Sequence, residues 1–352
     1  MNFLPNAAAL VIAGGRGTRF WPLSRGGRPK SLFSLNGKST LLAGTIARLM
    51  PLIPRQRIFV IIAADQTPAF LPAVRGLIPP GNLLIEPEGR GTTVAIAYGA
   101  AMIQSRLGPA TVAIVPADHH VVPPGGFRRT LGRALRIAAK DDAVVILGVP
   151  AIRAETGYGY QKIGSPVGDG FIVERFVEKP ALAEAKRMVR SGKYLWNAGI
   201  FVVSGATLAR EISAHCPALA DALPKLTASS ARKLADNYRR LDFDSFDREI
   251  VEKSSRVITV RADFRWFDVG SWDGVWEASR GRDGNVISGS VMALDCQGVV
   301  ARANGRLIVM MGLNDLIAVD AGDAILLARR SSSQDVRRIT EELRRRGMKR
   351  YL

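Results

Sequence analysis

An apolar run near the start of the chain ends in a cluster of glycines, and this junction constrains the fold most strongly. Residues Ala7–Ala13 predict a buried strand, and Gly14, Gly15 and Gly17 follow it directly. A glycine-rich turn after a strand can bring bare backbone N–H groups close to phosphate oxygens. The loop then carries the fixed cations Arg16, Arg19, Arg25 and Lys30. Guanidinium groups bind phosphate through paired hydrogen bonds, so the junction predicts a nucleotide-binding loop.

Two common nucleotide motifs do not fit this loop. The dinucleotide-binding fingerprint needs a third glycine where this chain has Phe20. A phosphate-binding loop ending in Gly37-Lys38-Ser39 would need glycine at position 32, which is Leu32. The loop is therefore of another kind.

Short apolar runs alternate with amphipathic stretches through the first 150 residues. The predicted strands are Ala7–Ala13, Ile58–Ala64, Val112–Val115 and Val144–Val149, and the predicted helices are Thr40–Met50, Thr92–Gln104 and Phe127–Ala139. This alternation predicts an α/β fold with a parallel sheet and helices on both faces. Ligands bind at the carboxyl ends of such strands, where the glycine loop and Asp118 both belong.

The remainder of the chain has a different pattern. Residues 157–270 mix predicted strands and helices, at Phe171–Glu178, Leu182–Arg190, Ile200–Val203 and Ala231–Arg239. After Gly284 come the short β runs Val299–Arg302, Leu307–Met311, Leu316–Val319 and Ala324–Ala328, then a helix at Gln334–Arg346. The runs are too irregularly spaced to predict a solenoid. We expect a catalytic domain over 1–283 and a β-rich domain ending in a helix over 284–352.

Composition excludes several classes of protein. No apolar run approaches the ~18 residues of a membrane span, and Leu4–Ala13 is better explained as a first strand than as a signal peptide. Two cysteines cannot form a disulfide framework, and three histidines have no metal-binding spacing. We therefore expect a cytoplasmic protein without a membrane partner.

The charge is strongly basic, with 49 Lys and Arg against 31 Asp and Glu and a net charge of +18. The cations are spread along the chain, with a denser region over 329–350 that predicts a solvated helix. No zinc-finger spacing or RNA-binding aromatic motif accompanies them, so we expect no specific nucleic-acid partner. Anionic substrates fit this charge, as does non-specific binding of polyanions at low salt.

The glycine loop resembles the signature of sugar-phosphate nucleotidyltransferases. Residues 14–25 match G-G-x-G-T-R-x-W-P-L-S-R, and Pro29-Lys30 follow. Within this stretch, Trp21–Arg25 resembles the mannose-1-phosphate guanylyltransferase branch. The resemblance implies a Rossmann-like domain with a mixed, mainly parallel sheet and a small β-rich C-terminal domain. It also implies nucleotide contacts from Gly14, Gly15, Arg16, Gly17 and Thr18, with Arg19 and Lys30 as catalytic cations.

Two acidic residues resemble the metal ligands of that family. Asp118 lies in Pro116-Ala-Asp-His119, which resembles P-[SA]-D-H, and Asp268 lies in a segment resembling W-x-D-[VI]-G-[ST]-W. The resemblance implies that Asp118 and Asp268 bind Mg²⁺. From the residues alone, an Asp after a strand is equally a helix N-cap, and an Asp between aromatic residues is equally a turn residue.

Four further segments resemble the sugar-phosphate site of the family. They are Gly157–Tyr160, Val177–Pro180, Trp196–Phe201 and Ser245–Lys253. The resemblance implies sugar-phosphate contacts from Gly159, Glu178, Lys179, Asn197 and Glu252. Taken singly, these segments are also compatible with a surface strand end, a turn and a solvated helix bearing a Glu249–Lys253 pair.

The segment Glu86–Ala95 matches the family's base-binding loop, E-P-x-x-R-N-T-A-P-A, only in part. Glu86, Arg90 and Thr92 match and are expected to bind nucleotide, but Gly91 replaces Asn, Thr93 replaces Ala and Val94 replaces Pro. The preference for guanine is therefore an inference from the rest of the pattern.

The resemblance covers about residues 7–283 and continues more weakly through the β-rich tail, where Gly305–Leu307 and Leu316–Asp320 resemble the short bacterial enzymes of the family. It implies an enzyme that converts GTP and α-D-mannose 1-phosphate to GDP-mannose and diphosphate, by in-line attack on the α-phosphate. The isomerase domain of longer relatives is absent, so we expect one activity. The alternatives are a heptose 1-phosphate acceptor or a different purine base, a non-catalytic sugar-nucleotide-binding homologue, and a polyanion-binding protein. The β-rich tail is a candidate homodimer contact.

Overall fold

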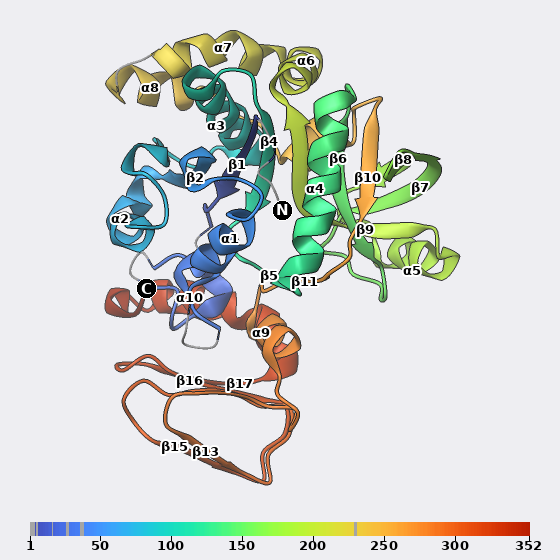
Figure 1. Ribbon diagram of the computed structural model, residues 1–352. Helices are drawn as coiled ribbons and strands as arrows, with labels where there is room; N and C mark the ends of the chain where they lie inside the picture. Colours follow the sequence, from blue (N-terminus) through green and yellow to red (C-terminus); the bar gives the residue numbers. More distant parts are fainter. Residues whose placement is uncertain (1–3, 5, 16, 26–27, 36–38, 229–230) are drawn as a thin grey trace.

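One large sheet organises the main body of the protein (Figure 1). The computed structural model describes residues 4, 6–15, 17–25, 28–35, 39–228 and 231–352. Within these residues a nine-stranded sheet has the order β3-β2-β1-β4-β9-β6-β10-β8-β7. Strands β9 and β8 run antiparallel to both of their neighbours in this order, and the remaining strands share one direction. The sheet is therefore mixed and mainly parallel.

The strands of this sheet are short, and most lie between helices in the sequence. They are β1 (Ala7–Ile12), β2 (Ile58–Ala63), β3 (Leu83–Glu86), β4 (Thr111–Pro116), β6 (Val144–Pro150), β7 (Tyr160–Val167), β8 (Gly170–Val177), β9 (Tyr194–Ser204) and β10 (Val257–Arg261). The helices are α1 (Leu41–Leu49), α2 (Thr67–Val74), α3 (Gly91–Leu107), α4 (Pro124–Lys140), α5 (Leu182–Ser191), α6 (Gly205–His215), α7 (Pro217–Ala228), α8 (Ala231–Tyr238), α9 (Trp272–Ser279) and α10 (Arg337–Arg345).

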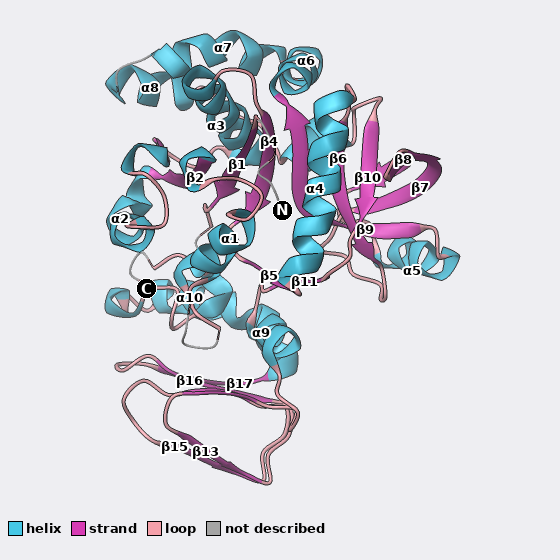
Figure 2. Ribbon diagram, in the orientation of Figure 1, coloured by secondary structure: helices cyan, strands magenta, loops and turns pink. Residues whose placement is uncertain are grey.

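Helices cover both faces of the sheet (Figure 2). Successive side chains of a strand point to opposite faces, and β1 is apolar on both. Its residues Ala7, Ala9 and Val11 pack in a core with residues of α1, α2, α4 and α5. Ala8 and Leu10 pack in the opposite core with residues of α3, α6 and α7. The predicted strands and helices of the first 150 residues are confirmed, with shifts of a few residues at their ends.

A small two-stranded sheet, which the sequence did not predict, brings distant segments together. Strand β5 (His119–Val122) pairs antiparallel with β11 (Arg265–Asp268), and His119 lies opposite Asp268 in the register. Strand β5 begins immediately after Asp118. The pairing therefore holds Asp118, just before β5, close to Asp268 at the end of β11, although 150 positions separate them in the chain.

The C-terminal strands wind in parallel, which corrects the expectation of irregular β runs. Strands β12 (Val286–Ser288), β14 (Val300–Arg302) and β16 (Leu316–Asp320) pair in parallel, β17 (Ile325–Arg329) completes that sheet, and β13 (Val291–Leu294) pairs in parallel with β15 (Ile308–Met311). Successive turns differ in length, so the sequence shows no fixed period. The predicted final helix also needs correction: α10 begins at Arg337, and a 3₁₀ segment, Arg330–Val336, precedes it.

The C-terminal segment packs on the glycine loop through a third apolar core. Buried Phe20 and Trp21 belong to one core with residues of β14, β16 and β17, and Val336 is also a member of this core. The indole Nε1 of Trp21 donates a hydrogen bond to the carbonyl of Tyr351 (2.8 Å). Arg25 is paired with Asp323. Figure 1 shows α9 and α10 between the large sheet and the C-terminal strands.

No helix in the described ranges is long and apolar enough to cross a membrane.

Candidate active site

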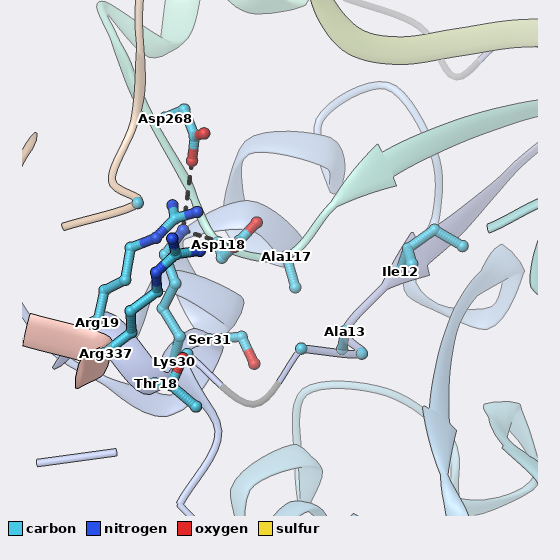
Figure 3. A pocket seen from close by; sticks show the side chains of 14 residues that line it. Ile12, Ala13, Thr18, Arg19, Lys30, Ser31, Ala117, Asp118, Asp268 and Arg337 are labelled. Atoms are coloured by element: carbon cyan, nitrogen blue, oxygen red, sulfur yellow. Dashed lines mark hydrogen bonds and ion pairs between the residues drawn. The ribbon is translucent and has the colours of Figure 1, made fainter. Parts of the chain in front are cut away.

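A cavity of about 380 Å³ opens where the glycine loop meets the small sheet (Figure 3). Its lining comes from β1 and its loop, the turn Lys30–Leu32, the end of β4 and the end of β11. The residues that line it are Ile12, Ala13, Gly14, Gly15, Gly17, Thr18, Arg19, Lys30, Ser31, Ala117, Asp118, Asp268, Gly270 and Arg337. The predicted phosphate-binding and metal-binding groups therefore meet in one place, apart from Arg16, which lies outside the described residues.

The ammonium group of Lys30 lies between the two predicted metal ligands. Its Nζ is 2.7 Å from Oδ2 of Asp118 and 3.3 Å from Oδ1 of Asp268. Lys30 is only 7% exposed, and a buried ammonium group is stable only with such partners. Burial by itself would raise the pKa of Asp118, but the positive charge of Lys30 offsets this and holds that pKa below its usual value. Asp118 is therefore ionised at neutral pH.

Glycines keep this cavity open. Gly17 has a left-handed φ of 56°, and a Cβ there would lie 2.8 Å from Cβ of Lys30. A Cβ at Gly270 would lie 3.4 Å from Nη1 of Arg19 and 3.5 Å from both carboxylate oxygens of Asp268. Larger residues would therefore displace Lys30 or fill the space between Arg19 and Asp268.

His119 supports the acidic pair from the side. The Nε1 group of Trp266 donates a hydrogen bond to Nδ1 of His119 (3.1 Å). Burial lowers the pKa of His119, which favours the neutral ring at pH 7. Its Nε2 is 4.0 Å from Oδ1 of Asp118. His119 thus orients the end of β4 rather than adding a charge.

The donor set suits a hard divalent cation. Asp118 and Asp268 present carboxylate oxygens on either side of one small volume, with Lys30 as the cation that they share. Mg²⁺ is commonly held by one or two carboxylates together with water and substrate phosphates, rather than by a full protein cage. Accordingly, the described residues contain no group of three or more His, Cys, Asp and Glu placed to hold a metal. The residues present fit a metal that completes its shell with substrate.

The predicted sugar-phosphate residues form a second cluster. A Cβ at Gly159 would lie 2.7 Å from Oε2 of Glu178 and 3.3 Å from Cβ of Asn197. The backbone N–H of Glu178 donates to Oε1 of Glu252 (2.7 Å), and Nζ of Lys179 is 2.8 Å from Oε1 of Glu178. Five residues from four separate segments of the sequence therefore lie together.

Asp247 belongs to the same cluster, and the sequence analysis did not single it out. The side-chain amide of Asn197 donates to Oδ1 of Asp247 (2.6 Å), and the Asn197 Oδ1 accepts from the N–H of Gly199 (3.0 Å). Burial, with the nearby charge of Glu178, raises the pKa of Asp247 to about 7. Its position in a π-helical turn, Asp247–Val251, is a feature often found at functional sites. Asp247 lies in the segment Ser245–Lys253, whose resemblance to a family motif could have singled it out. The sequence did not predict its hydrogen bond with Asn197.

The two clusters lie near one another at the carboxyl edge of the sheet. Gly199 follows Asn197 on β9, and a Cβ there would lie 3.7 Å from Cε1 of His119 and from Cγ of Pro116. Strand β9 is paired with β4, which ends just before Asp118. A ligand spanning both clusters would therefore meet the glycine loop at one end and Asn197 at the other.

The side chains of the three predicted base-loop residues, Glu86, Arg90 and Thr92, form hydrogen bonds or ion pairs with other residues of the protein. The hydroxyl of Tyr238 donates to Oε2 of Glu86 (2.6 Å), and burial raises the pKa of Glu86 to about 7. Arg90 is paired with Glu88, and Oγ1 of Thr92 accepts from the N–H of Phe246 (3.0 Å). None of the three is among the described residues that line the cavity. Their contact with a nucleotide stays a prediction.

Comparison with known proteins agrees with this geometry. The family described as nucleotidyl transferase matches residues 8–283. The chain belongs to this family. A MannoseP isomerase/GMP-like beta-helix domain matches residues 289–343, in agreement with the parallel winding of the C-terminal strands. The predicted fold class, a nucleotidyltransferase fold with a β-rich C-terminal part, is confirmed.

Individual relatives cover most of the chain. Xanthan biosynthesis protein XanB of Xanthomonas campestris is 34% identical over 96% of this chain and 73% of its own length. A mannose-1-phosphate guanylyltransferase of Escherichia coli has the same identity and coverage. A crystal structure from Thermus thermophilus, described as a mannose-1-phosphate geranyltransferase, is 35% identical with a TM-score of 0.88, over 96% of this chain and 99% of that one. Members of this family act on a nucleoside triphosphate and a sugar 1-phosphate and generally need a divalent metal ion.

Proposed function

We propose that the protein is a mannose-1-phosphate guanylyltransferase, which joins GTP and α-D-mannose 1-phosphate to give GDP-mannose and diphosphate. The observation that carries the proposal is the cavity in which the glycine loop, Lys30, Asp118 and Asp268 meet. The relatives named as mannose-1-phosphate guanylyltransferases support the choice of substrates. We also propose that the boundary between the catalytic domain and the β-rich domain lies between residues 283 and 284.

The triphosphate end of GTP occupies the cavity in this proposal. The loop Gly14–Gly17 offers backbone N–H groups to phosphate oxygens, as preorganised donors that need no rearrangement during reaction. Arg19 and Lys30 neutralise the charge that accumulates on the departing diphosphate. Lys30 is suited to this because packing against Phe20 and Gly17 limits the movement of its side chain.

The sugar 1-phosphate binds at the second cluster in this proposal. Carboxylates and an amide recognise hydroxyl groups by accepting and donating hydrogen bonds, and Glu178, Asn197 and Glu252 supply these groups. Lys179 supplies the charge for the acceptor phosphate. Its left-handed φ of 49° is unusual for a residue with a side chain and supports a functional placement.

Asp118 and Asp268 would hold the metal ion, which we propose is Mg²⁺. When bound, this ion stabilises negative charge on the reacting phosphates. The chain's own residues position the two substrates so that the acceptor phosphate oxygen attacks the α-phosphorus in line with the departing diphosphate. No group of the protein needs to form a covalent bond.

The experiment is a diphosphate-release assay on the purified protein with Mg²⁺, four nucleoside triphosphates and a panel of sugar 1-phosphates. We expect release with GTP and mannose 1-phosphate, and loss of release when EDTA removes the metal. Release with a heptose 1-phosphate or another base instead would reassign the substrates. Nucleotide binding without release from any pair would refute the enzymatic proposal. The cytoplasmic location and homodimer predicted from the sequence stay predictions.

A further inference from the structure

Arg337 lines the same cavity as the glycine loop, although it lies 320 positions after Gly17 in the sequence. It is the first residue of α10, in the part of the chain that follows the β-rich segment. Figure 3 shows the side chains of Arg337 and Arg19 reaching toward the region of Lys30, Asp118 and Asp268. Nothing in the signature motifs of the catalytic part points to this arginine.

The backbone at Arg337 is held in place by buried contacts. Its neighbour Val336 is 2% exposed and belongs to the core that contains Phe20 and Trp21. The hydroxyl of Ser333 accepts a hydrogen bond from the N–H of Asp273 (2.9 Å). Phe20 directly follows Arg19, and Val336 directly precedes Arg337. The same core therefore fixes the backbone positions of both arginines.

The charges in the cavity are unbalanced. Asp118 and Asp268 share the ammonium group of Lys30, whereas neither Arg19 nor Arg337 has an ion pair or side-chain hydrogen bond among the described residues. Nearby arginines of the same C-terminal segment are paired: Arg330 with Asp273, and Arg345 with Glu342. Two guanidinium groups that face one cavity, and that have no ion-pair partner there among the described residues, are stabilised when an anion binds between them.

We propose that Arg337 binds the terminal phosphates of the nucleoside triphosphate, and the diphosphate released from them, together with Arg19. The C-terminal segment therefore contributes a substrate-binding group to the active site, in addition to covering the glycine loop. A guanidinium donates two parallel hydrogen bonds to phosphate, which places the leaving group as well as neutralising it. This inference rests on the proposed function for the identity of the anion.

The test is direct binding of inorganic diphosphate to the full chain, measured by calorimetry in the presence of Mg²⁺. Arg337→Gln removes the charge, and Arg338→Gln is the matched control, because Arg338 is the next residue of α10, is exposed and does not line the cavity. We expect R337Q to weaken diphosphate binding about 10- to 100-fold, R338Q to change it less than about 2-fold, and R337K to recover part of the loss.

Equal diphosphate affinity in wild type and R337Q would overturn the inference, and so would absence of diphosphate binding in the wild type. The melting temperature of each variant shows whether it is folded. R337K keeps the charge and the aliphatic part of the side chain, so a loss of affinity in this variant reports on the guanidinium group alone. Binding is measured without turnover. Diphosphate binding that depends on Arg337 in a protein with no activity would therefore refute the proposed function and leave this inference standing.

Discussion

Gly91 offers a sharp test of how the base loop is built. The residue has a φ of 84°, and a Cβ there would lie 3.1 Å from the carbonyl oxygen of Asp244 and closer still to that of Phe243. Both carbonyl oxygens belong to the segment 243–246, which is hydrogen-bonded to the start of α3. The carbonyl of Asp244 accepts a hydrogen bond from the hydroxyl of Thr93, and the N–H of Phe246 donates one to the hydroxyl of Thr92. The resemblance to the family expects Asn at this position, and the close approach of residues 243–246 explains glycine instead.

The cost of a side chain at this position has two parts. A left-handed conformation costs an alanine about 1 kcal/mol, and overpacking against backbone costs about 1–3 kcal/mol. The lower entropy of the unfolded chain offsets about 0.5 kcal/mol, which leaves a net destabilisation of about 1.5–3.5 kcal/mol for Gly91→Ala. An unfolding entropy of about 2.1 cal/mol/K per residue then predicts a fall in melting temperature of about 2–5 °C.

Scanning calorimetry on three variants separates these contributions. Gly91→Asn carries the residue best tolerated at positive φ, so its destabilisation reports mainly the clash. Gly89→Ala is the control two residues away, where a Cβ would meet no atom within 4 Å. We expect it to change the melting temperature by less than about 1 °C. Melting of Gly91→Ala at the temperature of Gly89→Ala would refute the packing argument.

Three further predictions concern the clusters. Asp118→Asn should reduce turnover at least about 100-fold in the diphosphate-release assay, whereas exposed Asp169→Asn should not; full activity in Asp118→Asn would refute the metal assignment. The pKa of Glu86 is about 7 in the folded protein, against an ordinary value of 4.5. Between pH 4.5 and about pH 7 the folded state therefore keeps a proton that the unfolded state loses, so the free energy of unfolding falls as the pH rises through this window. Glu86→Gln should remove about 3 kcal/mol of that decline in denaturant titrations, and an unchanged pH profile would contradict it. Asn197→Ala should raise the KM for mannose 1-phosphate at least about 10-fold and leave that for GTP unchanged, because the buried carboxyl of Asp247 loses its donor; equal effects on both KM values would contradict the assignment of this cluster.

Local patterns in the sequence predicted the parts of this protein that depend on neighbouring residues. The run Ala7–Ala13 became β1, because apolar residues on both faces of a strand suit a sheet that is covered on both sides. The glycines after it, and the residue types at Lys30, Asp118 and Asp268, were also readable from the sequence, since each motif spans only a few positions. The roles of these residues came from resemblance to the family rather than from spacing.

Only the tertiary structure decided which distant groups meet. The pairing of β5 with β11 brings Asp118 to Asp268, and the core to which Val336 and Phe20 both belong brings Arg337 to the glycine loop. Neither contact leaves a periodic signal, because each depends on the free energy of burying side chains from segments far apart in the chain. The same holds for the hydrogen bond from Tyr238 to Glu86 and for the parallel winding of strands with unequal spacing. Short sequence motifs therefore identified most residues of the site, and packing between distant segments determined which of these residues meet.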